Sequence, residues 1–214
     1  MTDPAALLRG AQALIVDWDG TVVDNTAARR AALQAALAPH GIPVPTERYR
    51  ALAGLPVREV IARLAADAAL LPPPAEEVVA RSRAALLADP APRPIPCTLD
   101  LLQTAGSLGL PLAVASSAAA VLVHDGIQRL GLQAMLPVVV TLDDVPRGKP
   151  APDAYLEAAH RLGAAPMRCL AVDDAKDGIA AALAAGMRTL IIHHGRLVPV
   201  ATANTSGAVR AAQP

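Results

Sequence analysis

Aromatic residues are nearly absent from this sequence: there is no phenylalanine, and the 214 residues include two tyrosines and one tryptophan. Proteins that hold single-stranded nucleic acid or a nucleobase use aromatic rings as stacking platforms, so this scarcity argues against such a function. Hydrophobic residues nevertheless make up 53% of the chain. We therefore expect a core that consists of leucine, valine, isoleucine and alanine side chains.

The sequence also lacks an excess of charge and a long apolar run. The formal net charge is +0, which predicts no basic field for nucleic acid or an anionic membrane. The first ten residues do not show the basic segment and apolar run of a secretory signal. The longest apolar stretch, residues 111–123, contains two serines and falls short of the ~20 residues that a membrane span needs. We expect a cytoplasmic protein, monomeric or weakly dimeric, with no membrane or nucleic-acid partner.

Cysteine is scarce too. Cys97 and Cys169 are the only two in the chain, and their separation matches no metal-ligand spacing. We interpret them as free buried thiols in a reducing compartment, and the sequence leaves a single disulfide bridge open as the alternative.

What the sequence does contain is a series of short apolar runs that are followed by helical periodicity. Continuous runs of this length are typical of strands buried on both faces of a parallel sheet. The alternation predicts an α/β fold, a doubly wound parallel sheet with a Rossmann-like core, in which ligands bind at the carboxyl ends of the strands. The predicted strands are residues 13–17, 111–117, 138–141, 168–174 and 188–193, and the predicted helices are residues 98–108, 118–130, 152–162 and 177–185.

Residues 25–96 interrupt this alternation, because they show helical periodicity and no strand pattern. The predicted helices of this segment are residues 26–38, 57–70 and 75–87. Asn25, or either of its neighbours, is a suitable N-cap for the first helix. We therefore predict an inserted α-helical cap domain, residues 25–96, within an α/β catalytic core formed by residues 1–24 and 97–214.

The first predicted strand ends in VDWDGT, which places Asp17 and Asp19 two residues apart. At the end of a strand, two carboxylates with this spacing converge on one cavity. They repel each other unless a cation lies between them or one of them holds a proton, so the pair suggests a nucleophile and an acid beside a divalent metal. Thr21 adds a hydroxyl group, and Trp18 is expected to point into the core.

Further polar clusters follow later strands. Ser116 and Ser117 precede a helix, where hydroxyl and N–H groups together bind a phosphate oxygen. Lys149 provides a compact positive charge that suits one phosphoryl oxygen. Asp173 and Asp174 offer the oxygen ligands that Mg²⁺ prefers beside water and substrate phosphate. Each residue alone could be a helix cap or a solvated charge, but all of them lie beyond strands on one predicted edge of the sheet.

As a set, these clusters resemble the four motifs of the haloacid dehalogenase superfamily. The pattern is most similar to the helical-cap subgroup of phosphoglycolate phosphatase and β-phosphoglucomutase-like proteins, and the resemblance covers nearly the whole chain. The motifs are DWDGT at residues 17–21, the serine that ends a strand, GKPAPD at residues 148–153, and the DD pair followed by GIAAALAAGM.

The resemblance implies a role for each motif residue. Asp17 is the implied nucleophile and Asp19 the general acid and base. Ser116 and Lys149 bind the phosphoryl oxygens. The implied Mg²⁺ ligands are Asp17, the Asp19 backbone carbonyl and Asp174, with Asp173 in support.

The function implied is that of a Mg²⁺-dependent phosphatase, which hydrolyses a small phosphate ester of the phosphoglycolate or sugar phosphate type through an aspartyl phosphate. We expect Thr21 and Ser117 to assist substrate binding. A β-phosphoglucomutase-like mutase uses the same catalytic residues and stays open as the alternative. It needs a second phosphate site, for which Arg58 in the substrate-facing cap loop is the candidate, although a solvated helix charge is the plainer interpretation. A non-catalytic phosphate-binding or regulatory protein is the remoter alternative.

Related activities fit the sequence less well. A dehalogenase lacks a second aspartate at the position of Asp19, and a phosphonatase needs a cap lysine, which residues 25–96 do not contain. A receiver domain carries its acidic pair first in the chain rather than last. The sequence departs from the family pattern at Ala175, where serine is common, and at Lys176 and Asp177, which are unusual there. We also expect no further strand or helix after Gly195.

Overall fold

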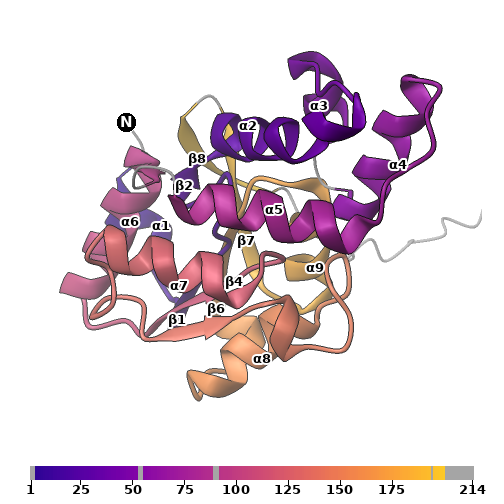
Figure 1. Ribbon diagram of the computed structural model, residues 1–214. Helices are drawn as coiled ribbons and strands as arrows, with labels where there is room; N and C mark the ends of the chain where they lie inside the picture. The colour runs from indigo at the N-terminus through magenta and orange to yellow at the C-terminus, as the bar shows by residue number, and fades with distance from the viewer. Residues whose placement is uncertain (1–2, 53–54, 89–91, 194, 201–214) are drawn as a thin grey trace, which may run out of the picture.

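The computed structural model describes residues 3–52, 55–88, 92–193 and 195–200 of the chain (Figure 1). Six strands form the central sheet: β1 (Ala13–Val16), β4 (Leu112–Ala115), β5 (Val138–Val140), β6 (Cys169–Asp173), β7 (Arg188–His193) and β8 (Arg196–Pro199). Their order is β5-β4-β1-β6-β7-β8. All neighbours pair in parallel except β7 and β8, which are antiparallel. This mostly parallel sheet confirms the predicted α/β fold.

Helices cover both faces of the sheet, which explains why its central strands are apolar throughout. The helices are α1 (Pro4–Leu8), α6 (Pro96–Ser107) and α7 (Ala120–Arg129) on one face, and α8 (Asp153–Arg161) and α9 (Lys176–Ala184) on the other. Strand β1 serves both layers because successive side chains of a strand point to opposite faces. Leu14 and Val16 pack toward the first group of helices, and Ala13 and Ile15 pack toward the second.

Trp18, directly after β1, is 2% exposed and belongs to the first hydrophobic cluster. The prediction that it points into the core is therefore confirmed. A Cβ atom on Gly126 of α7 would lie 2.5 Å from the Trp18 ring, so the absence of a side chain at position 126 lets this helix pack directly on the indole.

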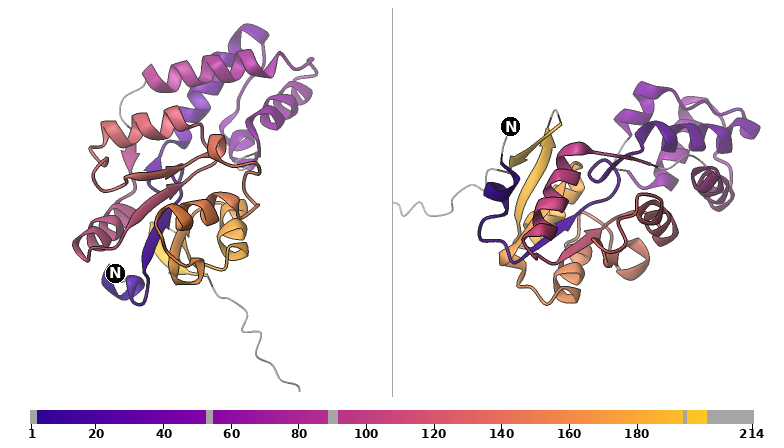
Figure 2. Two further views of the ribbon diagram at one scale, coloured as in Figure 1. Left: turned by 90° about the horizontal axis from the view of Figure 1, so that it is seen from below. Right: turned by 90° about the vertical axis from the view of Figure 1, so that its left-hand side faces the viewer.

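A second group of helices lies at one end of the molecule, away from the N-terminal helix (Figure 2). The group comprises α2 (Thr26–Leu37), α3 (Thr46–Ala51), α4 (Val57–Asp67) and α5 (Ala75–Ala88), which share a separate hydrophobic cluster. A short antiparallel pair, β2 (Val23–Asp24) with β3 (Arg93–Pro94), joins the chain entering this group to the chain leaving it. The group coincides with the predicted cap, whose domain boundaries stay a prediction.

Several elements differ from the sequence-based expectation. Helices α1 and α3 and the β2–β3 pair were not predicted, and short 3₁₀ turns occur at Ala38–His40, Leu142–Asp144 and Pro166–Arg168. The expectation of no strand after Gly195 is wrong, because β8 pairs with β7 and buries Leu197 against the sheet. Among the described residues, no helix is both long and apolar enough to cross a membrane.

Candidate active site

The predicted site residues follow strands that are neighbours in the sheet. Strand β1 lies between β4 and β6, and Val16 is in register with Val114 of β4 and Val172 of β6. On each of the three strands, a polar residue follows this register position within two residues. The sheet topology therefore brings Asp17, Ser116 and Asp173 to one edge, as expected for the carboxyl ends of parallel strands.

Lys149 connects two of the aspartates across this edge. Its ammonium Nζ donates to Asp17 Oδ1 at 2.6 Å and to Asp173 Oδ2 at 2.8 Å. The lysine side chain is 6% exposed and the two carboxylates are 9% and 1% exposed. An ion pair this deeply buried requires close geometry and full hydrogen bonding to offset the loss of hydration. The three groups therefore form one tightly bound polar cluster beneath the surface.

Asp173 has no free oxygen in this cluster. Besides Lys149, its Oδ2 accepts a hydrogen bond of 2.7 Å from the hydroxyl of Tyr155 in α8, and its Oδ1 accepts one of 2.9 Å from the backbone N–H of Ala175. A Cβ atom on Gly178 would lie 1.9 Å from Asp173 Oδ2, so α9 can approach this carboxylate only because residue 178 is glycine. Asp173 is thus held by groups from the protein itself.

Asp174 is exposed and makes fewer contacts. Its Oδ1 accepts a hydrogen bond of 3.2 Å from the Thr21 hydroxyl. Gly20, with φ +87°, leaves room for it, because a Cβ there would lie 2.2 Å from Asp174 Oδ2. The tight turn after Asp19 and the position of Asp174 therefore depend on the same glycine.

Burial is the main cause of the raised carboxyl pKa values in this cluster. Burial raises the pKa of Asp17 to about 8, with Asp173 and Asp19 adding to the rise and Lys149 opposing it. Burial and Asp173 also raise the pKa of Asp174. Burial works against the charge of Lys149, but the two carboxylates beside it outweigh burial and raise its pKa. The cluster also brings three carboxylates together with a single ammonium.

A divalent cation would balance these charges. Oxygen atoms of Asp17, Asp173 and Asp174 lie within 4.8 Å of one another. Oxygen donors of this kind fit Mg²⁺, which is held by one or two carboxylates together with water and substrate phosphate. Because Asp173 already accepts three hydrogen bonds from the protein, Asp17 and Asp174 are the carboxylates better placed to hold a cation. The donor set therefore fits a divalent metal.

Asp19 contacts the cap group rather than the lysine cluster. Its carboxylate accepts hydrogen bonds from the Asn25 amide, just before α2, and from the Arg29 guanidinium within α2. The Asp19 carboxylate raises the pKa of Arg29, although burial opposes this rise. Sequence reasoning treated Asn25 as a helix N-cap, but it makes no side-chain capping bond to α2. Its side chain donates to Asp19 instead.

The remaining predicted residues, Ser116, Ser117 and Arg58, differ in burial and in the partners they contact. Ser116 is buried, and its hydroxyl accepts a hydrogen bond of 3.1 Å from the Ala118 backbone N–H, while Ser117 is exposed. Arg58 of α4 forms an ion pair with Glu76 of α5, and the arginine side chain is 64% exposed. The structure thus brings Lys149 together with Asp17, Asp173 and Asp174 and leaves Arg58 in a pair within the cap group.

Cys97 and Cys169 are free thiols in the structure, so the expectation of unpaired cysteines fits it. Cys169 is buried as expected, whereas Cys97 is only half-buried. Burial raises the pKa of the Cys169 thiol, which makes the reactive thiolate form less accessible.

Sequence reasoning did not assign Tyr155, Asn25 or Arg29 to the site. Tyr155 stands two residues after the GKPAPD motif, and the scarcity of aromatic residues in the chain was the signal that could have drawn attention to it. Burial and the Asp173 and Asp17 charges raise the pKa of Tyr155 well above its ordinary value, so its hydroxyl is a donor at neutral pH. For Arg29 the sequence carried no signal beyond its place in the first turns of a cap helix.

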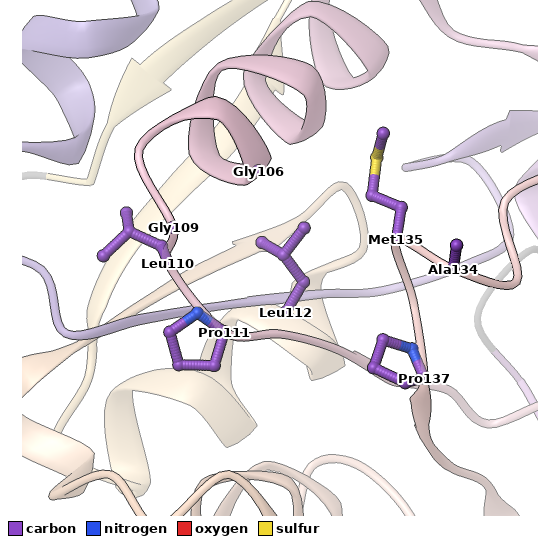
Figure 3. A pocket seen from close by; sticks show the side chains of 8 residues that line it. All are labelled: Gly106, Gly109, Leu110, Pro111, Leu112, Ala134, Met135 and Pro137. Atoms are coloured by element: carbon purple, nitrogen blue, oxygen red, sulfur yellow. The ribbon is translucent and has the colours of Figure 1, made fainter.

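An apolar hollow of about 430 Å³ lies at the opposite end of the sheet, where β4 and β5 begin (Figure 3). No charged side chain and none of the predicted site residues line it. Its position does not bear on the carboxylate cluster. The hollow is lined by Gly106, Gly109, Leu110, Pro111, Leu112, Ala134, Met135 and Pro137.

Comparison with known proteins adds independent evidence. Residues 11–186 match the model of a family of haloacid dehalogenase-like hydrolases. The chain is 33% identical to fructose-1-phosphate phosphatase of Escherichia coli strain K12, over 81% of this chain and 92% of the relative. It is 31% identical to validoxylamine A 7'-phosphate phosphatase of Streptomyces hygroscopicus subsp. limoneus, over 81% of each.

Solved structures show the same similarity. CbbY from Rhodobacter sphaeroides in complex with phosphate superimposes with a TM-score of 0.75 at 27% identity, over 85% of each chain. A β-phosphoglucomutase from Clostridium difficile superimposes with a TM-score of 0.69 over 84% of this chain and 83% of the other. At 20% identity, the second comparison shows a shared fold and nothing further.

Proposed function

The chain belongs to the haloacid dehalogenase-like hydrolase family as a phosphoric monoester hydrolase, and from that premise we propose that it transfers the phosphoryl group of a small metabolite to Asp17 and then to water. The observation that carries the proposal is the Lys149 ammonium, which lies in a buried site 2.6 Å from Asp17 and 2.8 Å from Asp173. A nucleophilic carboxylate and a fixed cation are the two groups that phosphoryl transfer by covalent catalysis needs first.

In the first step an Asp17 oxygen attacks the phosphorus in line, and the bond from phosphorus to the ester oxygen breaks. Lys149 lies where it can neutralise charge on an equatorial phosphoryl oxygen. The Ser116 hydroxyl, at the neighbouring strand end, is proposed to donate to a second oxygen, with Thr21 and Ser117 as further contacts. The product of this step is an aspartyl phosphate and an alcohol.

Asp19 is the proposed proton carrier. As a carboxylic acid it gives a proton to the leaving alcohol, and as a carboxylate it takes a proton from the water that hydrolyses the aspartyl phosphate. Its hydrogen bonds to Asn25 and Arg29 support this role, because they fix the direction of a carboxylate that Lys149 does not hold. The cap group thereby supplies part of the catalytic geometry.

Asp17 and Asp174, together with the Asp19 backbone carbonyl, are the proposed holders of Mg²⁺, with Asp173 supporting them through Lys149. A bound Mg²⁺ supplies positive charge that stabilises the phosphoryl oxygens. The excess of carboxylate over ammonium in the described site supports this cofactor.

The proposed substrate is a phosphate ester of a small polyol or sugar, or phosphoglycolate. This choice is supported by the names of the relatives, which include phosphatases of fructose 1-phosphate, validoxylamine A 7'-phosphate and N-acetylmuramic acid 6-phosphate. The scarcity of aromatic residues supports it as well, because a nucleotide base would find few rings for stacking.

The test is a measurement of phosphate release from p-nitrophenyl phosphate and from a panel of sugar phosphates and phosphoglycolate. We expect turnover with Mg²⁺, loss of turnover when EDTA removes it, and no turnover by Asp17→Asn under either condition. Equal activity of wild type and Asp17→Asn would overturn the proposal. The substrate with the highest kcat/KM identifies the class of ester.

A phosphomutase is the second candidate, since mutases share this fold. It requires a group that holds a second phosphate, and the proposed candidate Arg58 is already paired with Glu76. Incubation with β-glucose 1-phosphate distinguishes the two functions: a mutase forms a bisphosphate and an isomer, whereas a phosphatase releases phosphate and free sugar. The appearance of either set of products would exclude a non-catalytic role.

A further inference from the structure

Tyr155 is fully buried, and among the fully buried residues that the structure describes it is the largest. It lies on α8, in a cluster whose other members are mostly alanine. A ring of this size fills space that the small neighbours leave open, and its buried hydroxyl needs a hydrogen-bond partner to avoid a desolvation cost. The partner is Asp173 Oδ2, at 2.7 Å.

Asp173 is held from several sides as a result. Tyr155 and Lys149 both donate to its Oδ2, the Ala175 N–H donates to its Oδ1, and the backbone of α9 at Gly178 closes the remaining side. The carboxylate therefore has little freedom to rotate. Its orientation sets the position of the ammonium that binds to it.

Tyr155 also contacts Lys149 directly. The Nζ atom lies 5.0 Å from the centroid of the tyrosine ring, within the range of a cation–π interaction. A lysine ammonium has three N–H donors, and two of them go to Asp17 and Asp173. Among the described residues these two carboxylates are the acceptors of Nζ, so a third N–H can serve a phosphoryl oxygen.

We propose that Tyr155 is a positioning residue for phosphoryl transfer: its hydroxyl fixes Asp173 and its ring supports Lys149, so that the third ammonium donor points at the group being transferred. The inference rests on the proposed function, because it assigns Tyr155 a part in that same site. It concerns a residue that does not touch the substrate and acts through Lys149 and Asp173.

The test is Tyr155→Phe, which keeps the ring and removes the hydroxyl. Because a hydrogen bond to a charged group is lost, we expect kcat and kcat/KM to fall together by about tenfold or more, with KM nearly unchanged. The matched control is Thr189→Val, which removes another buried hydroxyl that bonds to the Met187 carbonyl and not to the site. The control should keep wild-type kcat.

Thermal unfolding of both variants separates positioning from stability. If the Tyr155 hydroxyl served the fold alone, both variants would lose stability and both would keep kcat per folded molecule, which would overturn the inference. A wild-type protein without any phosphatase activity would instead overturn the proposed function. An active wild type with a fully active Tyr155→Phe variant refutes only the role of Tyr155.

Discussion

The ion pairs of Lys149 in the α/β core and three ion pairs of the cap group differ in burial. The core pairs of Lys149 with Asp17 and Asp173 involve side chains that are at most 9% exposed. Three pairs of the cap group have side chains that are all at least 40% exposed: Arg48–Asp67, Arg58–Glu76 and Arg63–Glu59. Exposed pairs of this kind contribute little to the free energy of unfolding. The loss of one partner of a buried pair, in contrast, leaves an uncompensated buried charge.

This difference indicates where the chemistry depends on single residues. The core cluster is closed, and each group in it holds another in place. The cap group is polar toward water, and Asn25 and Arg29 connect it to Asp19, a proposed catalytic residue. Substitutions in the Lys149 cluster should therefore cause large losses of activity, and those in the cap should cause small ones, with Arg29 in between.

Lys149→Ala should cause the largest loss among the substitutions that follow. Removing one fixed charge from the transferring group lowers kcat by on the order of 10²–10³, and here it also leaves Asp17 and Asp173 without their shared counter-ion. The measurement is the initial rate on the preferred phosphate ester, and the matched control is Lys176→Ala, the other lysine of the chain, exposed at the start of α9. A rate for Lys149→Ala within a factor of about ten of wild type would contradict the role of the core cluster.

Gly178→Ala tests the same cluster through packing. The new Cβ would overlap the Asp173 carboxylate, so Asp173 must shift, and we expect lower kcat together with a loss of roughly 1–3 kcal/mol of unfolding free energy. Gly106→Ala in α6 is the control, because a Cβ there meets no atom within 4 Å and alanine favours a helix by up to about 1 kcal/mol. Chemical denaturation and kinetic assays of both variants provide the comparison; equal behaviour of the two would remove the packing argument.

The core could be predicted from sequence because buried parallel strands leave an unmistakable pattern. Strands that are covered on both faces must be apolar throughout, and the polar residues that follow them mark one edge of the sheet. Residues such as Asp17 and Lys149, which are 132 positions apart in the chain, can thus be assigned to one place from sequence alone. Strand β8 escaped prediction because it lies at the edge of the sheet and buries only Leu197, so it lacks the continuous apolar run of the central strands.

The contacts between cap and core could not be predicted, since they depend on how two separate hydrophobic clusters dock. Asn25 is a residue type that favours the N-cap and stands at the N-cap position. The local sequence cannot reveal that its amide donates to Asp19 instead. Tyr155 fits the apolar stripe of α8 equally well as a plain core residue. In both cases the helix was predicted correctly, and the partner of the side chain was decided by tertiary packing.

Arg29→Ala probes the point where the cap meets the catalytic core. The arginine side chain is 38% exposed, so water partly replaces the lost hydrogen bond to Asp19. We expect kcat to fall roughly three- to tenfold, as Asp19 loses one of the groups that orient it. Arg63→Ala is the control, because Arg63 pairs with Glu59 on the exposed face of α4. A fall as large as that of Lys149→Ala would mean that the cap is as essential to the chemistry as the core.

Arg58→Ala should have the smallest effect of these substitutions. It is also the one that best distinguishes a phosphatase from a mutase. The pair with Glu76 is exposed, so its loss should change the free energy of unfolding by less than about 1 kcal/mol. If the pair is all that Arg58 forms, kcat/KM stays close to wild type for every phosphate ester, and Glu76→Gln behaves in the same way. If Arg58 leaves Glu76 to bind substrate, kcat/KM falls in Arg58→Ala and not in Glu76→Gln, and falls most for a bisphosphate. That second result would place a substrate-binding charge in the cap and remove the distinction between a chemical core and a merely polar cap.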